Sequence, residues 1–146
     1  MRVAIIIIAL LLPVIAKADL VIVFVDESSL SYDLSPRNYD NSPRNYDNSV
    51  RNYDNSIRNY SNSPRNYDNS PRNYDNGKSG KRRLLIEKND GQYFAGYYVW
   101  SDGRILNFFS DSGERMFYSP AQTGAIFDSE SGEFCGTLAN TNGKDV

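Results

Sequence analysis

The sequence predicts a mainly β protein, with a small antiparallel meander or barrel-like module at its carboxy-terminal end. Within residues 84–139, apolar and aromatic runs alternate with Asp-Gly and Ser-Gly turns, which is typical of hairpins. Before them, residues 35–76 repeat a heptad rich in turn-forming residues. The first eighteen residues read as an export signal. We therefore expect one compact β-module preceded by a repeat tract, in a secreted chain.

Residues 1–18 have the organisation of a cleaved signal peptide. Arg2 supplies a positive charge, residues 3–15 are apolar, and Ala16-Lys17-Ala18 places small residues at the peptidase site. Cleavage is expected between Ala18 and Asp19, which makes the protein periplasmic or secreted. The alternative is a retained membrane anchor, but a span needs roughly 20 apolar residues and this run ends at Lys17.

Residues 19–34 form an amino-terminal segment of the mature chain. Residues 20–25 read LVIVFV, and this β-branched run predicts a strand. Residues 28–34 resemble a decayed copy of the heptad that follows.

Six consecutive heptads occupy residues 35–76, with the consensus Ser-Pro-Arg-Asn-Tyr-Asp-Asn. A coiled coil is excluded, because it needs two apolar positions per heptad and cannot accommodate the recurrent Pro. Each unit instead predicts an extended Pro-Arg pair followed by an Asn-Tyr-Asp-Asn turn. Two structures fit this pattern: a disordered or turn-rich spacer, or a small β-solenoid with several units per coil.

The Arg and Tyr of each heptad are the candidate binding residues. Arg offers a charge with five donors, and Tyr offers a stacking face. An array with one such pair every seven residues suits a multivalent ligand. The candidates are Arg37, Tyr39, Arg44, Tyr46, Arg51, Tyr53, Arg58, Tyr60, Arg65, Tyr67, Arg72 and Tyr74. The expected partner is an envelope polysaccharide or another envelope protein. Nucleic acid is disfavoured by the export signal and by the Asp in most units.

A basic hinge, residues 77–83, precedes the module of residues 84–139, and residues 140–146 form a tail. The expected strands cover residues 83–88, 92–100, 104–110, 114–119, 125–128 and 133–138. The second of them is apolar on both faces, with Tyr97 and Val99 on one and Tyr98 and Trp100 on the other. Either the sheet closes into a barrel, or its second face is covered, by residues 20–25 as an extra strand or by a partner chain.

The composition argues against an enzyme. The chain has no His and one Cys, which removes Ser-His-Asp and Cys-His catalysis and the usual zinc sites. No cofactor or metal is expected. The one remaining catalytic alternative is a hydrolase that uses carboxylates in turns. Those carboxylates are Asp90, Asp102, Asp111, Asp128 and Glu130. The lone Cys135 is expected to be buried, or else to pair with a second chain in a dimer.

The charge is unevenly distributed along the chain. Residues 35–83 carry ten bases and five acids, a net +5, whereas residues 84–146 carry four bases and nine acids, a net −5. This asymmetry predicts that the repeat tract docks on an acidic surface or on the chain's own ends, if it is not simply a solvated tract.

The Ser-Pro-x-Asn-Tyr-x-Asn tandem heptad is combined with a tail containing Gly96-Tyr97-Tyr98-Val99 and Phe134-Cys135-Gly136. This combination resembles small exported proteobacterial proteins with asparagine-rich heptads, a group that carries no established activity. We therefore expect a non-enzymatic, envelope-associated interaction or structural protein. A carbohydrate-binding module that uses the repeated Arg-Tyr units is the alternative.

Overall fold

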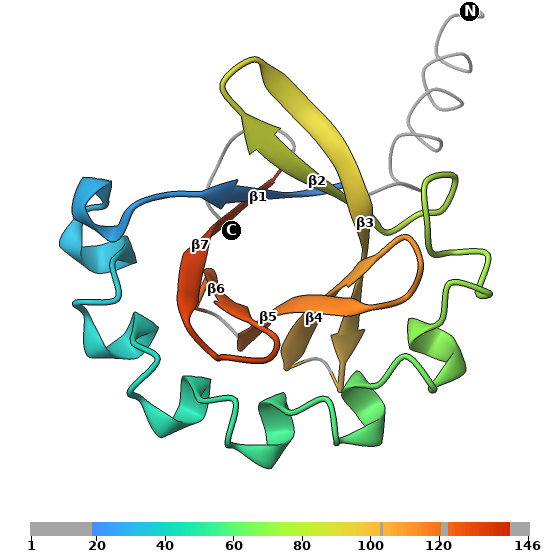
Figure 1. Cartoon of the computed structure of the whole chain (residues 1–146), viewed down its shortest axis with the longest axis horizontal. Coiled ribbons are helices and arrows are strands. Elements are labelled where there is room, and N and C mark those ends of the chain that lie inside the picture. The colour runs from blue at the N-terminus through green and yellow to red at the C-terminus, as the bar shows by residue number, and fades with distance from the viewer. Residues whose placement is uncertain (1–18, 103, 121–122, 141–146) are drawn as a thin grey trace, which may run out of the picture.

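The computed structural model describes residues 19–102, 104–120 and 123–140. Seven strands form a closed barrel, and the heptad tract runs around the outside of this barrel as an arc (Figure 1). The predicted mainly β fold is confirmed, and the barrel-like alternative is the correct one. The predicted leader, residues 1–18, and most of the predicted tail, residues 141–146, lie outside the described residues.

The strands lie close to where the sequence predicts them. They are β1 Leu20–Phe24, β2 Arg83–Lys88, β3 Gly91–Ser101, β4 Ile105–Ser110, β5 Arg115–Pro120, β6 Ala125–Asp128 and β7 Phe134–Asn140. The LVIVFV run is thus the first strand of the barrel, and Asn140, assigned to the tail from the sequence, ends the last one. Aromatic and β-branched side chains explain why these segments prefer extended backbone.

Strand β1 closes the barrel by pairing with both β2 and β7. It runs parallel to β2, with Leu20 opposite Leu84, and antiparallel to β7, with Ile22 opposite Leu138. All other neighbouring strands are antiparallel. Parallel neighbours cannot be joined by a tight turn and need a long crossover connection. Residues 25–82, which include all six heptads, provide that connection.

We call residues 27–76 the girdle. Its 3₁₀ helices are short and regularly spaced, and all but the first lie in successive heptads or in their decayed copy. They are Glu27–Ser29, Tyr32–Leu34, Tyr39–Asn41, Tyr46–Asn48, Tyr53–Asn55, Tyr60–Asn62 and Tyr67–Asn69. The tract is therefore turn-rich, as one alternative predicted. It is neither a separate spacer nor a solenoid with its own core, because it packs against the barrel.

The barrel has an apolar interior and a second apolar layer beneath the girdle. Ile22, Leu84, Tyr98 and Phe108 belong to the main core cluster. Tyr97, Val99 and Phe109 form another buried cluster, and the Tyr97 hydroxyl reaches the girdle at Asn69. The sheet thus closes into a barrel over one face of β3, with residues 20–24 as an extra strand as predicted. The repeat tract, which the sequence did not indicate as a cover, lies over the other face.

Not every aromatic side chain of β3 is core. Tyr97 and Tyr98 are buried, whereas Tyr93 and Trp100, near the two ends of the strand, are exposed. Within the described part of the chain, none of the helices has the length and hydrophobicity that a membrane crossing requires.

Candidate functional site

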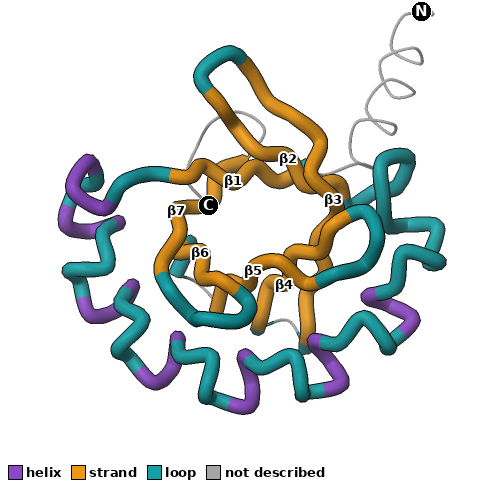
Figure 2. Tube along the Cα trace, in the orientation of Figure 1, coloured by secondary structure: helices purple, strands orange, loops and turns teal. Residues whose placement is uncertain are grey.

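Each heptad folds into two consecutive turns. In the unit that begins at Ser42, the Ser42 hydroxyl accepts a 3.1 Å hydrogen bond from the backbone N–H of Arg44. The Asn45 N–H then donates to the Ser42 carbonyl oxygen at 3.1 Å and closes the first turn. Asn45 Oδ1 accepts from the backbone N–H of Asp47 at 3.0 Å and caps the helix Tyr46–Asn48. Ser and Asn are well suited to such local bonds. The units therefore alternate helix and turn along the girdle (Figure 2).

The last Asn of each unit faces inward and joins consecutive units. These residues are Asn41, Asn48, Asn55, Asn62, Asn69 and Asn76, and all are buried. The Nδ2 group of Asn62, for example, donates to the carbonyl oxygen of Asp54 in the preceding unit at 2.8 Å and to that of Ser56 in its own unit at 3.0 Å. The same pair of bonds recurs at the other five positions. These bonds satisfy buried carbonyl groups that have no sheet partner.

Four of these asparagines also receive one polar side chain each from the outer face of the barrel. The Tyr118 hydroxyl donates to the Asn48 carbonyl oxygen at 2.7 Å. Arg115 Nη2 donates to the Asn55 carbonyl oxygen at 2.7 Å. The other two bonds are Asn107 Nδ2 to Asn62 Oδ1 at 3.1 Å and the Tyr97 hydroxyl to the Asn69 carbonyl oxygen at 2.6 Å. Successive units thus dock on β5, β5, β4 and β3 in turn.

The docking side chains are shielded from water, and their ionisation reflects this. Burial raises the pKa of Tyr97 and of Tyr118 to about 12 in each case. Burial also lowers the pKa of Arg115 to about 10, and its guanidinium carbon lies 4.8 Å from the centre of the Tyr118 ring. All three therefore hold their protons at neutral pH, so each remains a hydrogen-bond donor to the girdle.

Because Ser and the last Asn of each unit face the barrel, Arg and Tyr face solvent. All twelve residues predicted as binding candidates are exposed. The Tyr side chains of units one to five retain 52% to 59% of their accessible surface, and Tyr74 retains 81%. Tyr32, in the decayed unit, extends this row at 58%. The structure therefore assembles an ordered row of exposed aromatic side chains, while their role in binding stays a prediction.

Two Tyr hydroxyls each reach the backbone of the Arg in the next unit. The Tyr53 hydroxyl donates to the Arg58 carbonyl oxygen at 3.4 Å, and the Tyr60 hydroxyl donates to that of Arg65 at the same distance. A Tyr of one unit thus contacts the position that carries the Arg of the next. We call the exposed Tyr and Arg side chains of residues 37–74 the Tyr-Arg row.

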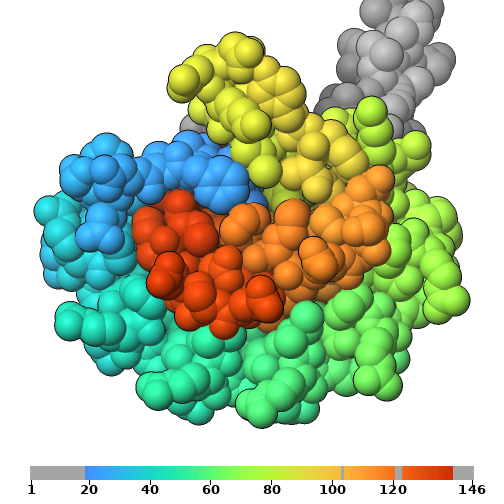
Figure 3. Space-filling model, viewed as in Figure 1, coloured from blue at the N-terminus to red at the C-terminus, as the bar shows by residue number. Residues whose placement is uncertain are grey.

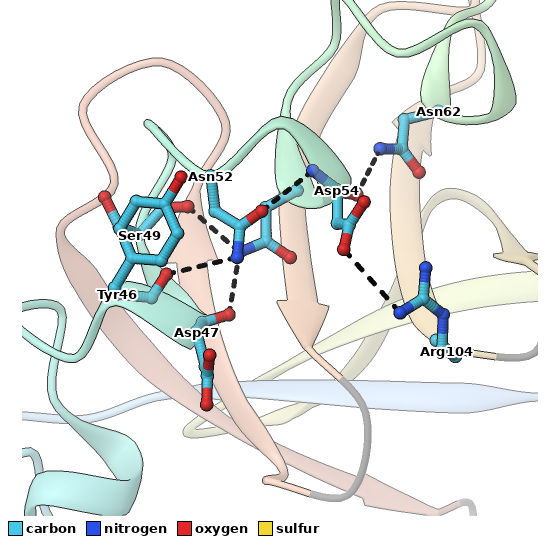
Figure 4. Close-up of polar contacts among 8 residues, drawn as sticks. Tyr46, Asp47, Ser49, Asn52, Asp54, Asn62 and Arg104 are labelled. Carbon is cyan, nitrogen blue, oxygen red and sulfur yellow. Dashed lines mark hydrogen bonds and ion pairs between the residues drawn. The ribbon is translucent and has the colours of Figure 1, made fainter.

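The aspartates of the girdle line a different surface. A groove of about 550 Å³ lies between the girdle and the barrel end at which β4 begins, and it is lined by Asp33, Asp40, Asp47 and Asp54 from four successive units. Figure 4 shows the contacts at Asp54, whose carboxylate lies 3.6 Å from the guanidinium of Arg104. No repeat Arg lines this groove.

A second cleft, of about 770 Å³, lies along the opposite edge of the girdle. Val50, Ile57 and Pro64, each the second residue of its unit, line it together with Arg58 and the start of β5. The turns at this end of the barrel approach the girdle closely. A Cβ added to Gly132 would lie 3.1 Å from Val50, and one added to Gly113 would lie 2.7 Å from Pro71. In the space-filling view, the units from cyan to green border the orange and red strands (Figure 3).

Sequence reasoning missed the four docking residues, Tyr97, Asn107, Arg115 and Tyr118. A signal for two of them is visible in retrospect. Asn107 interrupts the apolar run ILNFFS, and Arg115 begins an otherwise apolar aromatic strand. A buried polar residue needs a partner, so such interruptions indicate a covered outer face.

Among the carboxylates that a hydrolase would need, Asp90, Asp102 and Asp111 lie in separate turns, whereas Asp128 and Glu130 belong to one turn. Asp102 precedes β4 and Asp111 follows it, so a six-residue strand separates them, a length of roughly 20 Å. Paired glycosidase carboxylates lie roughly 5–9.5 Å apart. Asp128 instead accepts backbone hydrogen bonds from Glu130 and Ser131, and that of Ser131 is the main cause of its lowered pKa.

Cys135 is half-buried and packs against the main core cluster. Burial raises the pKa of its thiol, which disfavours the reactive thiolate. A dimer formed through Cys135 stays a prediction.

Comparisons of the chain with protein-family models, with curated proteins and with solved structures found no match.

Proposed function

We propose that this protein is an exported, non-enzymatic interaction protein of the cell envelope that binds an extended polysaccharide through its Tyr-Arg row. One observation carries the proposal: in each of the six heptads, the Tyr side chain is more than half exposed although the last Asn of the same unit is buried. A regular array of solvated aromatic side chains exposes apolar surface that a ligand would cover.

The arrangement suits a long, repetitive ligand better than a small one. The exposed Tyr residues recur at heptad intervals along the girdle, whose backbone forms an arc around the barrel (Figure 2). Aromatic faces pack against apolar ring faces such as those of sugars. Weak contacts add up when one chain engages several of them, because each later contact is intramolecular.

The girdle also favours binding by keeping the row ordered. A flexible repeat would lose conformational entropy on binding, roughly 1–2 kcal/mol for each backbone residue that becomes fixed. Here the capping and inter-unit bonds of Asn45 and Asn48 already fix the backbone around Tyr46. A preorganised surface avoids much of that entropic penalty.

Affinity gel electrophoresis tests the proposal. The chain, expressed with its own leader, is run through gels containing dextran, xylan or polygalacturonate, beside the triple variant Tyr46→Ala, Tyr53→Ala, Tyr60→Ala. We expect at least one polysaccharide to retard the wild type, and the triple variant to lose that retardation.

The matched control is Tyr93→Ala, Trp100→Ala, which removes two exposed aromatic side chains from the barrel and none from the row. This control should keep the wild-type retardation, and unchanged thermal melts would show that both variants are folded. Equal retardation of all three proteins, or of none by any polysaccharide, contradicts the proposal.

A further inference from the structure

The arginines of the girdle are exposed and largely unengaged. The side chains of Arg44, Arg51, Arg65 and Arg72 make no hydrogen bond or ion pair with the described residues, although their backbone N–H groups are held by Ser hydroxyls. Each guanidinium has five N–H donors and a permanent charge. The backbone of these four Arg residues is thus held in place, while their guanidinium groups lie in solvent.

Nearby aspartates do not neutralise these charges. Residues 35–76 contain six Arg and five Asp, so from the sequence alone the tract looks almost balanced. Among the described residues, however, the three ion pairs are Lys81–Asp75, Arg83–Asp19 and Arg104–Asp54, and none of them joins a repeat Arg to a repeat Asp.

The fold directs the two charges to different surfaces. Four consecutive acidic side chains, from Asp33 to Asp54, line the groove that faces one end of the barrel. Arg58 lines the cleft on the opposite edge. The first four aspartates of the girdle thereby form an acidic groove, while the exposed Arg and Tyr side chains lie outside that groove.

We infer that the ligand of the Tyr-Arg row is an acidic polysaccharide, one that carries carboxylate or sulfate groups along its chain. This inference rests on the proposed function and specifies its ligand. Arg binds carboxylate and sulfate oxygens through paired, charge-assisted hydrogen bonds. A neighbouring Tyr, such as Tyr53 beside Arg58, supplies the apolar contact to the sugar ring. Acidic and apolar features that alternate along one polymer match this alternation of Arg and Tyr.

The experiment compares two sets of three charge removals. The row variant is Arg44→Gln, Arg51→Gln, Arg65→Gln, whose side chains make no contacts that the fold requires. The matched control, Lys78→Gln, Lys88→Gln, Arg104→Gln, removes the same net charge from outside the row. Full-length protein matured from its own leader is titrated with polygalacturonate, with dextran of similar length and with single-stranded poly(dT), at low and at physiological salt.

We expect polygalacturonate to bind and dextran to bind at least tenfold more weakly. Loss of three exposed charged contacts should weaken polygalacturonate binding about tenfold in the row variant. The control should change it less than twofold. Added salt should weaken wild-type binding more than row-variant binding, because fewer charges remain to be screened.

The outcomes separate this inference from the proposed function. If dextran binds as tightly as polygalacturonate, and both depend on the row tyrosines, the proposed function stands and the acidic ligand is wrong. If the control weakens binding as much as the row variant, net charge rather than the row attracts the polymer, and the inference is again wrong. Tighter binding of poly(dT) than of polygalacturonate overturns the ligand class. Binding of none of the three overturns this inference, and the proposed function fails with it if xylan also leaves the protein unretarded.

Discussion

The hydroxyl of Tyr97 donates a 2.6 Å hydrogen bond to the backbone carbonyl oxygen of Asn69, and both residues are buried. Three heptads earlier in the girdle, the hydroxyl of Tyr118 makes the equivalent 2.7 Å bond to the backbone carbonyl oxygen of Asn48. Tyr97 of β3 and Tyr118 of β5 thus hold the fifth and the second heptad on the barrel. Arg115 and Asn107 bond the third and fourth heptads between them. The repeats are ordered because the barrel presents one donor to each of four successive units.

Substitution of Tyr97 by Phe tests this docking directly. The ring and its stacking on Phe109, at 5.3 Å between centroids, are retained, while the buried Asn69 carbonyl group loses its donor. An unsatisfied buried acceptor costs about 1–3 kcal/mol. We expect Tyr97→Phe to lower the free energy of unfolding by that amount in urea titrations. Tyr60→Phe, which removes an exposed hydroxyl from the row, should leave it unchanged within about 0.5 kcal/mol. Equal effects would mean that the girdle is not held through Tyr97.

The same hydroxyl should contribute to alkaline unfolding. The pKa of Tyr97 is raised from 10.0 to about 12 in the folded chain, chiefly by burial. Between these values the unfolded chain loses the proton while the folded chain keeps it, so this contribution to stability is complete below pH 10 and is lost as the pH rises to about 12. Arg115, whose pKa is lowered to about 10, acts in the opposite sense over this range.

Arg115 is present in both the wild type and Tyr97→Phe, so its contribution cancels in the stability difference between the two proteins. We expect the stability difference between wild type and Tyr97→Phe, measured by urea unfolding at several pH values, to be constant below pH 10 and to shrink above it. A difference that stays constant up to pH 12 would show that the hydroxyl ionises equally in both states.

The last Asn of a heptad should matter more than the Asn that caps its helix. Asn62 donates to two carbonyl groups and accepts from Asn107, all in buried surroundings. In the same unit, Asn59 accepts one bond from the backbone N–H of Ser61. We expect Asn62→Ala to lower the free energy of unfolding by about 2–4 kcal/mol, and Asn59→Ala by about 1 kcal/mol. Equal losses in urea titrations would contradict the assignment of Asn62 as the residue that joins units to each other and to the barrel.

Local patterns in the sequence correctly predicted much of the fold. All six strands expected after residue 82 are present, because Gly turns and aromatic, β-branched runs are local signals. The turn within each heptad is also local, since Asn45 caps the helix that begins at the next residue. The apolar character of β3 on both faces correctly indicated that its second face is covered.

The girdle itself could not be predicted in this way. Its ordering depends on partners 28 to 70 residues away, such as Tyr97 for Asn69 and Tyr118 for Asn48. In the sequence, the repeat looks polar and lacks a core of its own. Its Asn side chains become buried only because the outer face of the barrel supplies the apolar surface and the donors. For the same reason, the sequence indicated which residues form the candidate site but not that the fold separates Arg from Asp.

Deletion of one heptad distinguishes a girdle from a spacer most sharply. Removal of residues 56–62 leaves a tract of five nearly identical units, which a flexible spacer would tolerate because loop entropy depends only weakly on length. In this fold, the tract must still connect the end of β1 to the start of β2 around the barrel. Four docking side chains must also meet four successive units. The deletion forces at least one of these contacts to break or the arc to shorten.

We therefore expect the deletion to lower the urea midpoint, with a loss of at least about 2 kcal/mol in the free energy of unfolding. The matched control keeps the unit and changes only its sequence to the consensus, through Ile57→Pro and Ser61→Asp. Pro and Asp are the residues at the equivalent positions of the next unit, and Ile57 is exposed. This control should therefore unfold close to the wild-type midpoint. A deletion variant with the wild-type midpoint would mean that the repeats are interchangeable in number, and that docking on the barrel does not set the length of the girdle.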